Sequence, residues 1–102
     1  MLKVAIVGAA GRMGRTLVEA VSQNSSTMRV SVATVLADDP VLGVDIGLLA
    51  IGAAIGVKTV AELASDGSDF DVLVDFTSPE ATMGHLAYCQ AKNKAMVVGT
   101  TG

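Results

Sequence analysis

The pattern of apolar and polar positions changes period several times along the chain. Short, mostly apolar runs predict strands that are covered on both faces. Four runs are of this kind: residues 4–7, 30–35, 71–76 and 95–100. Between some of these runs the apolar residues recur every three to four positions, which is typical of amphipathic helices. Strands that alternate with helices predict right-handed crossovers and a parallel sheet, and therefore an α/β fold.

The first predicted helix follows the first strand closely. Met13, Leu17 and Val21 share one stripe of this helix, whereas Arg15 and Glu19 lie off it. An apolar stripe of this kind faces the core in a globular protein. We therefore expect the three apolar side chains to pack against the sheet.

A second helix is expected directly after the third strand. Ser78 is a suitable N-cap, and Pro79 suits the first helical position. The helix is expected to extend to Lys92, because a cation is favourable near the C-terminus of a helix. Its inward residues are predicted to be Met83, Leu86 and Ala87.

The stretch between the second and third strands keeps neither period for long. Residues 41–56 contain four glycines and a single charge, Asp45. We expect an irregular or mobile segment whose apolar side chains cover another surface or are themselves covered. Residues 57–60 are expected to form a short strand, and residues 60–65 a short helix.

A glycine-rich turn joins the first strand to the first helix. Gly8, Gly11 and Gly14 are spaced G-x-x-G-x-x-G, and Ala10 stands where the usual dinucleotide fingerprint has its middle glycine. Glycines let the backbone approach a pyrophosphate, and the helix N-terminus offers N–H groups and a partial positive charge. The alternative is a turn whose glycines serve tight packing only. Arg12 favours the phosphate interpretation, because a cation in the turn suits an anionic ligand better than it suits packing.

Loops at three strand ends carry small or hydroxyl side chains. They comprise residues 8–13, 76–78 and 99–101. In open parallel sheets, ligands bind at the carboxyl ends of the strands, where the strand order reverses. The three loops together therefore predict one continuous cofactor crevice, although threonine and serine are ordinary loop residues when each loop is taken alone.

Composition and charge narrow the class of protein. The 102 residues suffice for one small domain, and an apolar content of 51% allows a real core. A net charge of −3 argues against a nucleic-acid binder, which needs a basic face. No metal site is expected, because Cys89 is the only cysteine and is placed in or beside the core. His85 has no Cys or His nearby and is expected on a helix surface rather than as a ligand.

No membrane-spanning or export segment is recognisable. The longest uncharged stretch, residues 46–57, has twelve residues, whereas a spanning helix needs about twenty. The N-terminus enters a strand directly and lacks the pattern of a signal peptide. We expect a soluble, cytoplasmic protein without a membrane partner.

Three motifs resemble those of the 4-hydroxy-tetrahydrodipicolinate reductase family, also called dihydrodipicolinate reductases. They are VAIVGAAGRMGR, DFDVLVDFTSPEAT and the terminal MVVGTTG, and they span nearly the whole chain. The resemblance implies a Rossmann-like domain that binds NADH or NADPH. It also implies reduction of a small cyclic substrate, 4-hydroxy-tetrahydrodipicolinate, in the diaminopimelate route to lysine. A second α+β domain in the family supplies substrate binding and the contacts of a homo-tetramer.

The resemblance assigns cofactor contacts to particular residues of this chain. The residues expected to hold the pyrophosphate are Gly8, Ala9, Ala10, Gly11, Arg12 and Met13, with Arg12 near the adenosine side. Phe76 and Thr77 are expected to flank the crevice. The nicotinamide side is expected to be lined by Gly99, Thr100 and Thr101.

The chain departs from the family at the position that contacts the adenosine ribose. The family places an acidic residue just after the second strand, where this chain has Val35 and Leu36. The nearest acids are Asp38 and Asp39. Either the loop shifts to bring Asp38 in, or the ribose contact is lost. Without an acid at Val35, NADPH is expected to bind at least as well as NADH.

The resemblance also implies that the catalytic histidine and lysine lie in the second domain of the family. Residues 1–102 are therefore expected to be a truncated N-terminal NAD(P)-binding domain with no catalytic residue and no turnover of its own. A non-catalytic regulatory module that binds a dinucleotide, and a structural domain whose turn binds nothing, remain the alternatives.

Overall fold

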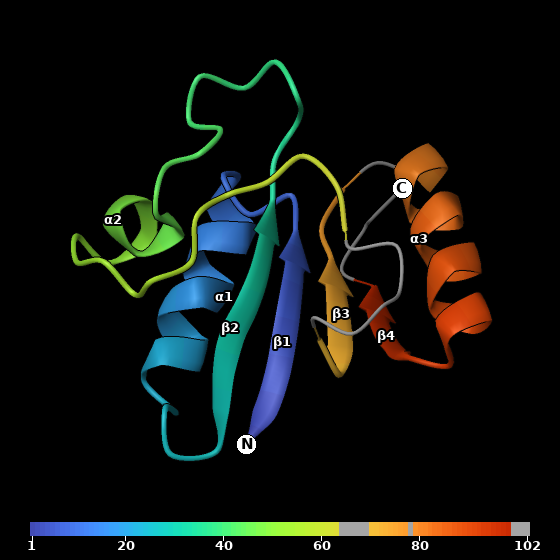
Figure 1. Ribbon diagram of the computed structural model, residues 1–102, viewed down its shortest axis with the longest axis horizontal. Helices are drawn as coiled ribbons and strands as arrows, with labels where there is room; N and C mark the ends of the chain where they lie inside the picture. Colours follow the sequence, from blue (N-terminus) through green and yellow to red (C-terminus); the bar gives the residue numbers. More distant parts are fainter. Residues whose placement is uncertain (64–69, 78, 99–102) are drawn as a thin grey trace.

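The computed structural model describes residues 1–63, 70–77 and 79–98. In this part of the chain, four strands form one parallel sheet in the order β2-β1-β3-β4 (Figure 1). The strands are β1 (Leu2–Val7), β2 (Met28–Thr34), β3 (Val72–Asp75) and β4 (Ala95–Val98). The parallel sheet predicted from the apolar runs is confirmed. The prediction that every strand is covered on both faces is wrong for β4, which lies at the edge of the described sheet and is largely exposed.

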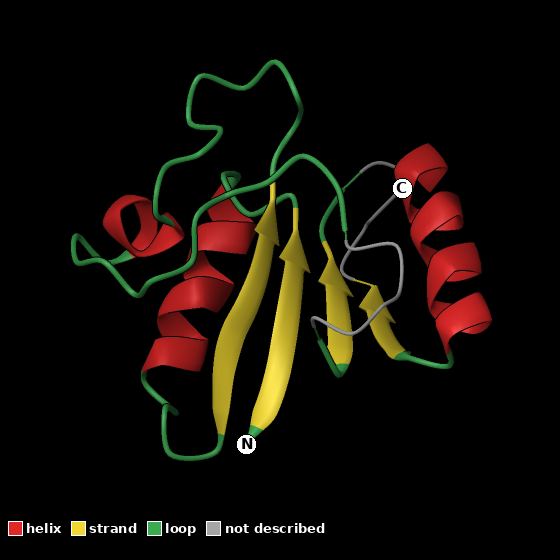
Figure 2. Cartoon of the chain, viewed as in Figure 1, coloured by secondary structure: helices red, strands yellow, loops and turns green. Residues whose placement is uncertain are grey.

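Helices lie on both sides of the sheet. The helices α1 (Arg12–Ser22) and α2 (Ile46–Ala50) lie on one side, and α3 (Pro79–Lys92) lies on the other (Figure 2). This arrangement follows from the side-chain alternation of β1. Val4 and Ile6 pack in the core beneath α1, whereas Ala5 and Val7 pack in a second cluster with Cys89 of α3. The Rossmann-like α/β fold is therefore confirmed, as is the prediction that Cys89 lies in the core.

The inward face of α1 differs in part from the prediction. Val21 is buried and Leu17 is half-buried, but the side chain of Met13 is 55% exposed. Gly14 takes the inward position instead. The backbone packs so closely there that a Cβ would lie 2.4 Å from the carbonyl oxygen of Gly8. The backbone of α1 therefore lies against the preceding turn, and this contact leaves Met13 on the outside.

The predicted inward face of α3 is wrong. The exposed residues of the helix include Met83, Leu86 and Ala87. The inward residues are His85, Tyr88 and Cys89, and the ring of Tyr88 stacks on Phe70 with 6.1 Å between centroids. Apolar residues occur on both faces of this helix, so periodicity alone did not identify the buried one. The apolar pattern does not mark the buried face, because that face carries a histidine and a tyrosine.

Residues 41–56 are organised around Asp45 rather than irregular throughout. The Asp45 carboxylate accepts hydrogen bonds from the backbone N–H groups of Gly47 at 2.8 Å, Ile55 at 3.0 Å and Gly56 at 2.8 Å. These bonds cap α2 and close the following loop onto it. Ile46 at the start of α2 is fully buried in the core beneath α1. The apolar segment therefore covers the α1 side of the sheet, which confirms the expectation that its apolar side chains cover another surface.

Several predicted element ends shift. The strand expected at residues 57–60 is replaced by two isolated bridges, Asp45 to Lys58 and Thr34 to Val60. Residues 61–63 are not helical, and the remainder of the helix expected at 60–65 lies outside the described residues. Ser78, the expected N-cap of α3, and residues 99–100 of the last expected strand also lie outside them. None of the described helices is long and apolar enough to cross a membrane.

The bonds to Asp45 predict a pH-dependent stability. Hydrogen bonds from Ile55, and also from Gly47 and Gly56, hold the pKa of Asp45 below its ordinary value of 3.8, against the opposing effect of burial. This stabilisation is present above the ordinary pKa and is lost as pH falls through the lower folded pKa. Asp45→Asn should therefore lower the thermal midpoint at pH 7, with a difference from the parent chain that shrinks below about pH 4.

Thermal unfolding followed by circular dichroism at neutral and acidic pH measures this difference. The matched control is Asp38→Asn, because the Asp38 side chain is exposed. An Asp45→Asn midpoint equal to that of the control at pH 7 would contradict the assigned role of the carboxylate.

Candidate functional site

The glycine turn between β1 and α1 presents the start of a helix to the carboxyl end of the sheet. Gly8 adopts a positive φ of 76°, and the Gly11 N–H donates to the Gly8 carbonyl oxygen at 3.3 Å. The Ala9 N–H is bonded to the Thr34 carbonyl oxygen at 3.0 Å, which ties the turn to the end of β2. Gly11 is the N-cap of α1 and provides no side-chain hydrogen bond. The first N–H groups of α1 therefore have no side-chain cap.

The structural reason for a glycine differs among the three positions of the turn. Gly8 needs its positive φ, and a Cβ there would lie 3.1 Å from Cγ2 of Thr77. Gly14 is required by the close packing of α1 described above. Gly11 has an ordinary φ of −72°, and a Cβ there would meet only the Gly8 oxygen, at 3.5 Å. Packing therefore accounts for Gly8 and Gly14 and leaves the absence of a side chain at Gly11 unexplained.

The end of β3 forms the wall that faces this turn. Asp75 is fully buried, and its carboxylate accepts from the Thr77 N–H at 2.7 Å and from the Thr77 hydroxyl. Nδ1 of His85, on α3, lies 2.7 Å from the other carboxylate oxygen. Burial raises the pKa of Asp75, but hydrogen bonds from Thr77 and His85 outweigh it and hold the pKa below its ordinary value. The carboxylate is therefore ionised at neutral pH and fixes the backbone after β3.

A cavity of about 490 Å³ lies between the two walls, at the carboxyl ends of β1, β2 and β3. It is lined by Gly8, Ala10, Gly11, Thr34, Val35, Leu36, Asp39, Ala61, Phe76, Thr77, Ala81 and His85. Its position is the one at which parallel α/β sheets bind ligands. The helix N-terminus on one side suits an anionic group, and the hydroxyl and carboxylate side chains suit ribose hydroxyls.

The structure brings together part of the predicted cofactor site. The lining includes Gly8, Ala10, Gly11, Phe76 and Thr77. Ala9 is fully buried in the core, and the side chains of Arg12 and Met13 are exposed and outside the lining. The predicted nicotinamide-side residues Gly99, Thr100 and Thr101 lie outside the described residues.

The structure corrects the predicted position of His85 and the choice between the two acids nearest the ribose position. His85 was expected on the helix surface, but its side chain is only 25% exposed and pairs with Asp75. The signal for it was Asp75 itself, because an acid at the end of a buried strand requires donors. Asp39 lines the cavity, whereas Asp38 is exposed and outside the lining. Counting residues from the glycine turn gives Val35 as the ribose-contacting position, and Asp39 follows it by four residues, so the count alone did not place Asp39 in the cavity.

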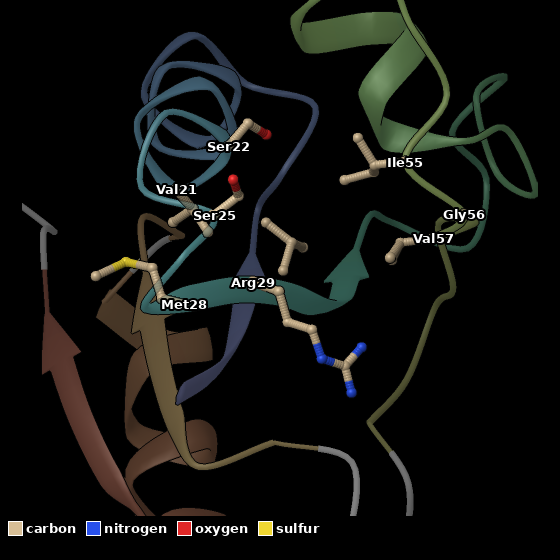
Figure 3. A pocket seen from close by; sticks show the side chains of 9 residues that line it. Val21, Ser22, Ser25, Met28, Arg29, Ile55, Gly56 and Val57 are labelled. Atoms are coloured by element: carbon tan, nitrogen blue, oxygen red, sulfur yellow. The ribbon is translucent and has the colours of Figure 1, made fainter. Parts of the chain in front are cut away.

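A second cavity, of about 290 Å³, lies near the opposite ends of the strands, between the C-terminal end of α1, the start of β2 and residues 55–57. Its lining is mainly apolar, and in Figure 3 the guanidinium of Arg29 points away from the hydroxyls of Ser22 and Ser25. These groups do not converge on one point. Among the described residues, no cluster of three His, Cys, Asp or Glu side chains is arranged to hold a metal ion.

Comparison with known sequences identifies close relatives. Residues 2–102 match the family described as dihydrodipicolinate reductase, N-terminus. Over 102 residues the chain is 47% identical to the 4-hydroxy-tetrahydrodipicolinate reductase of Pseudomonas fluorescens (strain Pf0-1), covering 100% of this chain and 38% of that protein. Over 100 residues it is 48% identical to the protein of the same name from Saccharophagus degradans (strain 2-40), covering 98% of this chain and 37% of the relative.

A solved structure shows the same fold. The dipicolinate-bound dihydrodipicolinate reductase from Paenisporosarcina sp. TG-14 superposes with a TM-score of 0.74 at 30% sequence identity, over 100% of this chain and 38% of that one. The chain thus spans 38% of the length of this structural relative. Because the family match covers residues 2–102, the chain belongs to the dihydrodipicolinate reductase family and corresponds to its N-terminal, NAD(P)H-binding domain.

Proposed function

We propose that residues 1–102 form the cofactor-binding domain of a 4-hydroxy-tetrahydrodipicolinate reductase and hold NADH or NADPH in the cavity between the glycine turn and the Phe76–Thr77 turn. The observation that carries this proposal is Gly11. It stands at the helix N-terminus and in the cavity wall, and neither backbone strain nor packing requires a glycine there. A phosphate that approaches the backbone supplies the missing reason.

The residues of this chain would bind and orient the cofactor, which supplies a hydride when it is bound. The glycine turn would place its N–H groups around the pyrophosphate. Phe76 and Thr77 would close the opposite wall and limit the access of water to the bound dinucleotide. We assign no catalytic role to any residue of this chain, and Gly99, Thr100 and Thr101 remain proposed contacts of the nicotinamide side.

The wider assignments extend this proposal to the whole protein. The substrate would be 4-hydroxy-tetrahydrodipicolinate, in accordance with the names of the relatives. The reaction would belong to cytoplasmic lysine biosynthesis, and the protein would assemble as a homo-oligomer. Exposed apolar side chains on α3 and β4 support an assembly surface, among them Met83 (64% exposed), Val97 (55%) and Val98 (50%).

Asp39 bears on the choice of cofactor. Asp39 lines the cavity together with Val35 and Leu36, the positions at which the resemblance places the family's ribose-contacting acid. One carboxylate oxygen accepts from the Val41 N–H at 2.9 Å, which anchors the side chain in this loop. A carboxylate accepts hydrogen bonds from ribose hydroxyls and repels a 2′-phosphate. We therefore propose that this chain prefers NADH, in place of the sequence-based expectation that NADPH binds at least as well.

The first prediction of this function concerns Gly11. Gly11→Asp should keep the fold, because aspartate is a favourable N-cap and its Cβ has room. It should weaken NADH binding at least about tenfold relative to Gly11→Asn, because the added carboxylate repels the pyrophosphate. The asparagine variant is the matched control, with the same shape and cap but no charge. Calorimetric titration gives both affinities, and equal affinities in two folded variants would contradict the phosphate assignment.

The second prediction concerns cofactor preference. The parent chain should bind NADH more tightly than NADPH, and Asp39→Asn should reduce this preference at least about fivefold, since removal of the charge relieves the repulsion of the 2′-phosphate. Asparagine retains the oxygen that accepts from Val41. Asp38→Asn serves as the control and should leave the ratio of the two dissociation constants unchanged. An unaltered ratio in Asp39→Asn would remove Asp39 from the ribose site.

A further inference from the structure

Asp75 is the single buried charged side chain among the described residues. A buried carboxylate is unfavourable unless donors surround it, and the loss of one donor leaves an incompletely solvated charge. The position of Asp75 at the end of β3 therefore places a strict demand on the neighbouring groups. Those groups belong to the turn that forms one wall of the cavity and to α3.

The donors to Asp75 come from two different segments. Thr77 contributes its N–H and its hydroxyl, both to the same carboxylate oxygen, and His85 contacts the other oxygen through Nδ1 at 2.7 Å. Because an ionised carboxylate only accepts hydrogen bonds, Nδ1 carries the proton in this pair. His85 thereby connects the carboxylate at the strand end to the second turn of α3.

The position of Thr77 sets the approach of the two walls of the cavity. Its Cγ2 atom lies only 3.1 Å from the point where a Cβ would stand on Gly8. The Phe76–Thr77 turn is thus in close contact with the glycine turn. A displacement of Thr77 would change the width of the crevice where the dinucleotide is proposed to lie.

The imidazole of His85 also lines a neighbouring cavity of about 240 Å³. The two cavities share Thr34, Ala61 and His85 in their walls. His85 therefore stands at the boundary between them. Its contact with the carboxylate fixes this boundary as well as the turn.

We propose that His85 is a positioning residue of the dinucleotide site: by donating from Nδ1 to Asp75, it holds the carboxylate that fixes the Phe76–Thr77 turn against the glycine turn. His85 acts through Asp75 and Thr77 on the shape of the crevice. The expected effect of His85 on dinucleotide affinity rests on the proposed function. The expected effect of His85 on the position of Thr77 does not.

The experiment compares two substitutions of His85 in the full 102-residue chain. Asparagine places an amide N–H close to the position of Nδ1, whereas leucine fills similar space without a donor. Gln90→Ala, at an exposed position of the same helix, is the control. Dissociation constants for NADH and NADPH are measured by calorimetry, and exchange of the Thr77 amide hydrogen is followed by nuclear magnetic resonance without ligand.

His85→Leu should weaken the binding of both NADH and NADPH about tenfold or more, as expected when a hydrogen bond to a charged group is lost. It should also accelerate exchange of the Thr77 amide. His85→Asn should restore both properties to within about threefold of the parent chain, and Gln90→Ala should leave them unchanged. If His85→Leu does not fold, His85→Ala is measured in its place, because alanine favours the helix.

Three results would overturn the inference. The first is parent-like Thr77 exchange and affinity in His85→Leu. The second is an equal loss of affinity in the leucine and asparagine variants, which would mean that the imidazole itself contacts the ligand. The third is a parent chain that binds no dinucleotide, combined with a rate of Thr77 amide exchange in His85→Leu equal to that of the parent chain. Failure of the parent chain to bind, with accelerated exchange in His85→Leu, would instead reject the proposed function and retain the positioning role.

Discussion

The close approach of α1 to the turn that precedes it is the constraint on which the site depends. Gly14 allows the helix backbone to lie against Gly8, since a Cβ at Gly14 would lie 2.4 Å from the Gly8 oxygen. This packing fixes the first turn of α1 at the carboxyl end of β1. The partial positive charge of the helix therefore faces the cavity. The close packing of Gly8 and Gly14 therefore determines where the N-terminus of α1 meets the cavity.

Two carboxylates then shape the loops around that helix. Asp45 gathers three backbone N–H groups and folds a glycine-rich segment over the α1 side of the sheet. Asp75 performs the equivalent task after β3, where it fixes the wall opposite the glycine turn. In both cases a side-chain acceptor replaces regular secondary structure as the source of order. The scaffold is apolar, but polar contacts define the crevice.

The extent to which the sequence predicts this molecule depends on the range of the interactions involved. The strands and the start of α3 at Pro79 are predictable, because they depend on local apolar runs and on local conformational preferences. The buried face of α3 was not predictable, because it contains His85 and the helix also carries apolar residues such as Met83 outside. That face is decided by Asp75, ten residues away in sequence and on another element. The glycine turn was recognised by its spacing, but only the structure separates the packing role of Gly14 from the unexplained Gly11.

The central claim is that a dinucleotide binds between the glycine turn and the Phe76–Thr77 turn. Its most direct test is a titration of the isotope-labelled chain with NADH, followed through the backbone amide resonances. The account predicts saturable shifts at Gly8, Gly11 and Thr77, with little change around Ser25 and Ile55 at the second cavity. Saturable shifts confined to the second cavity, or no shifts at all in the folded chain, would contradict it.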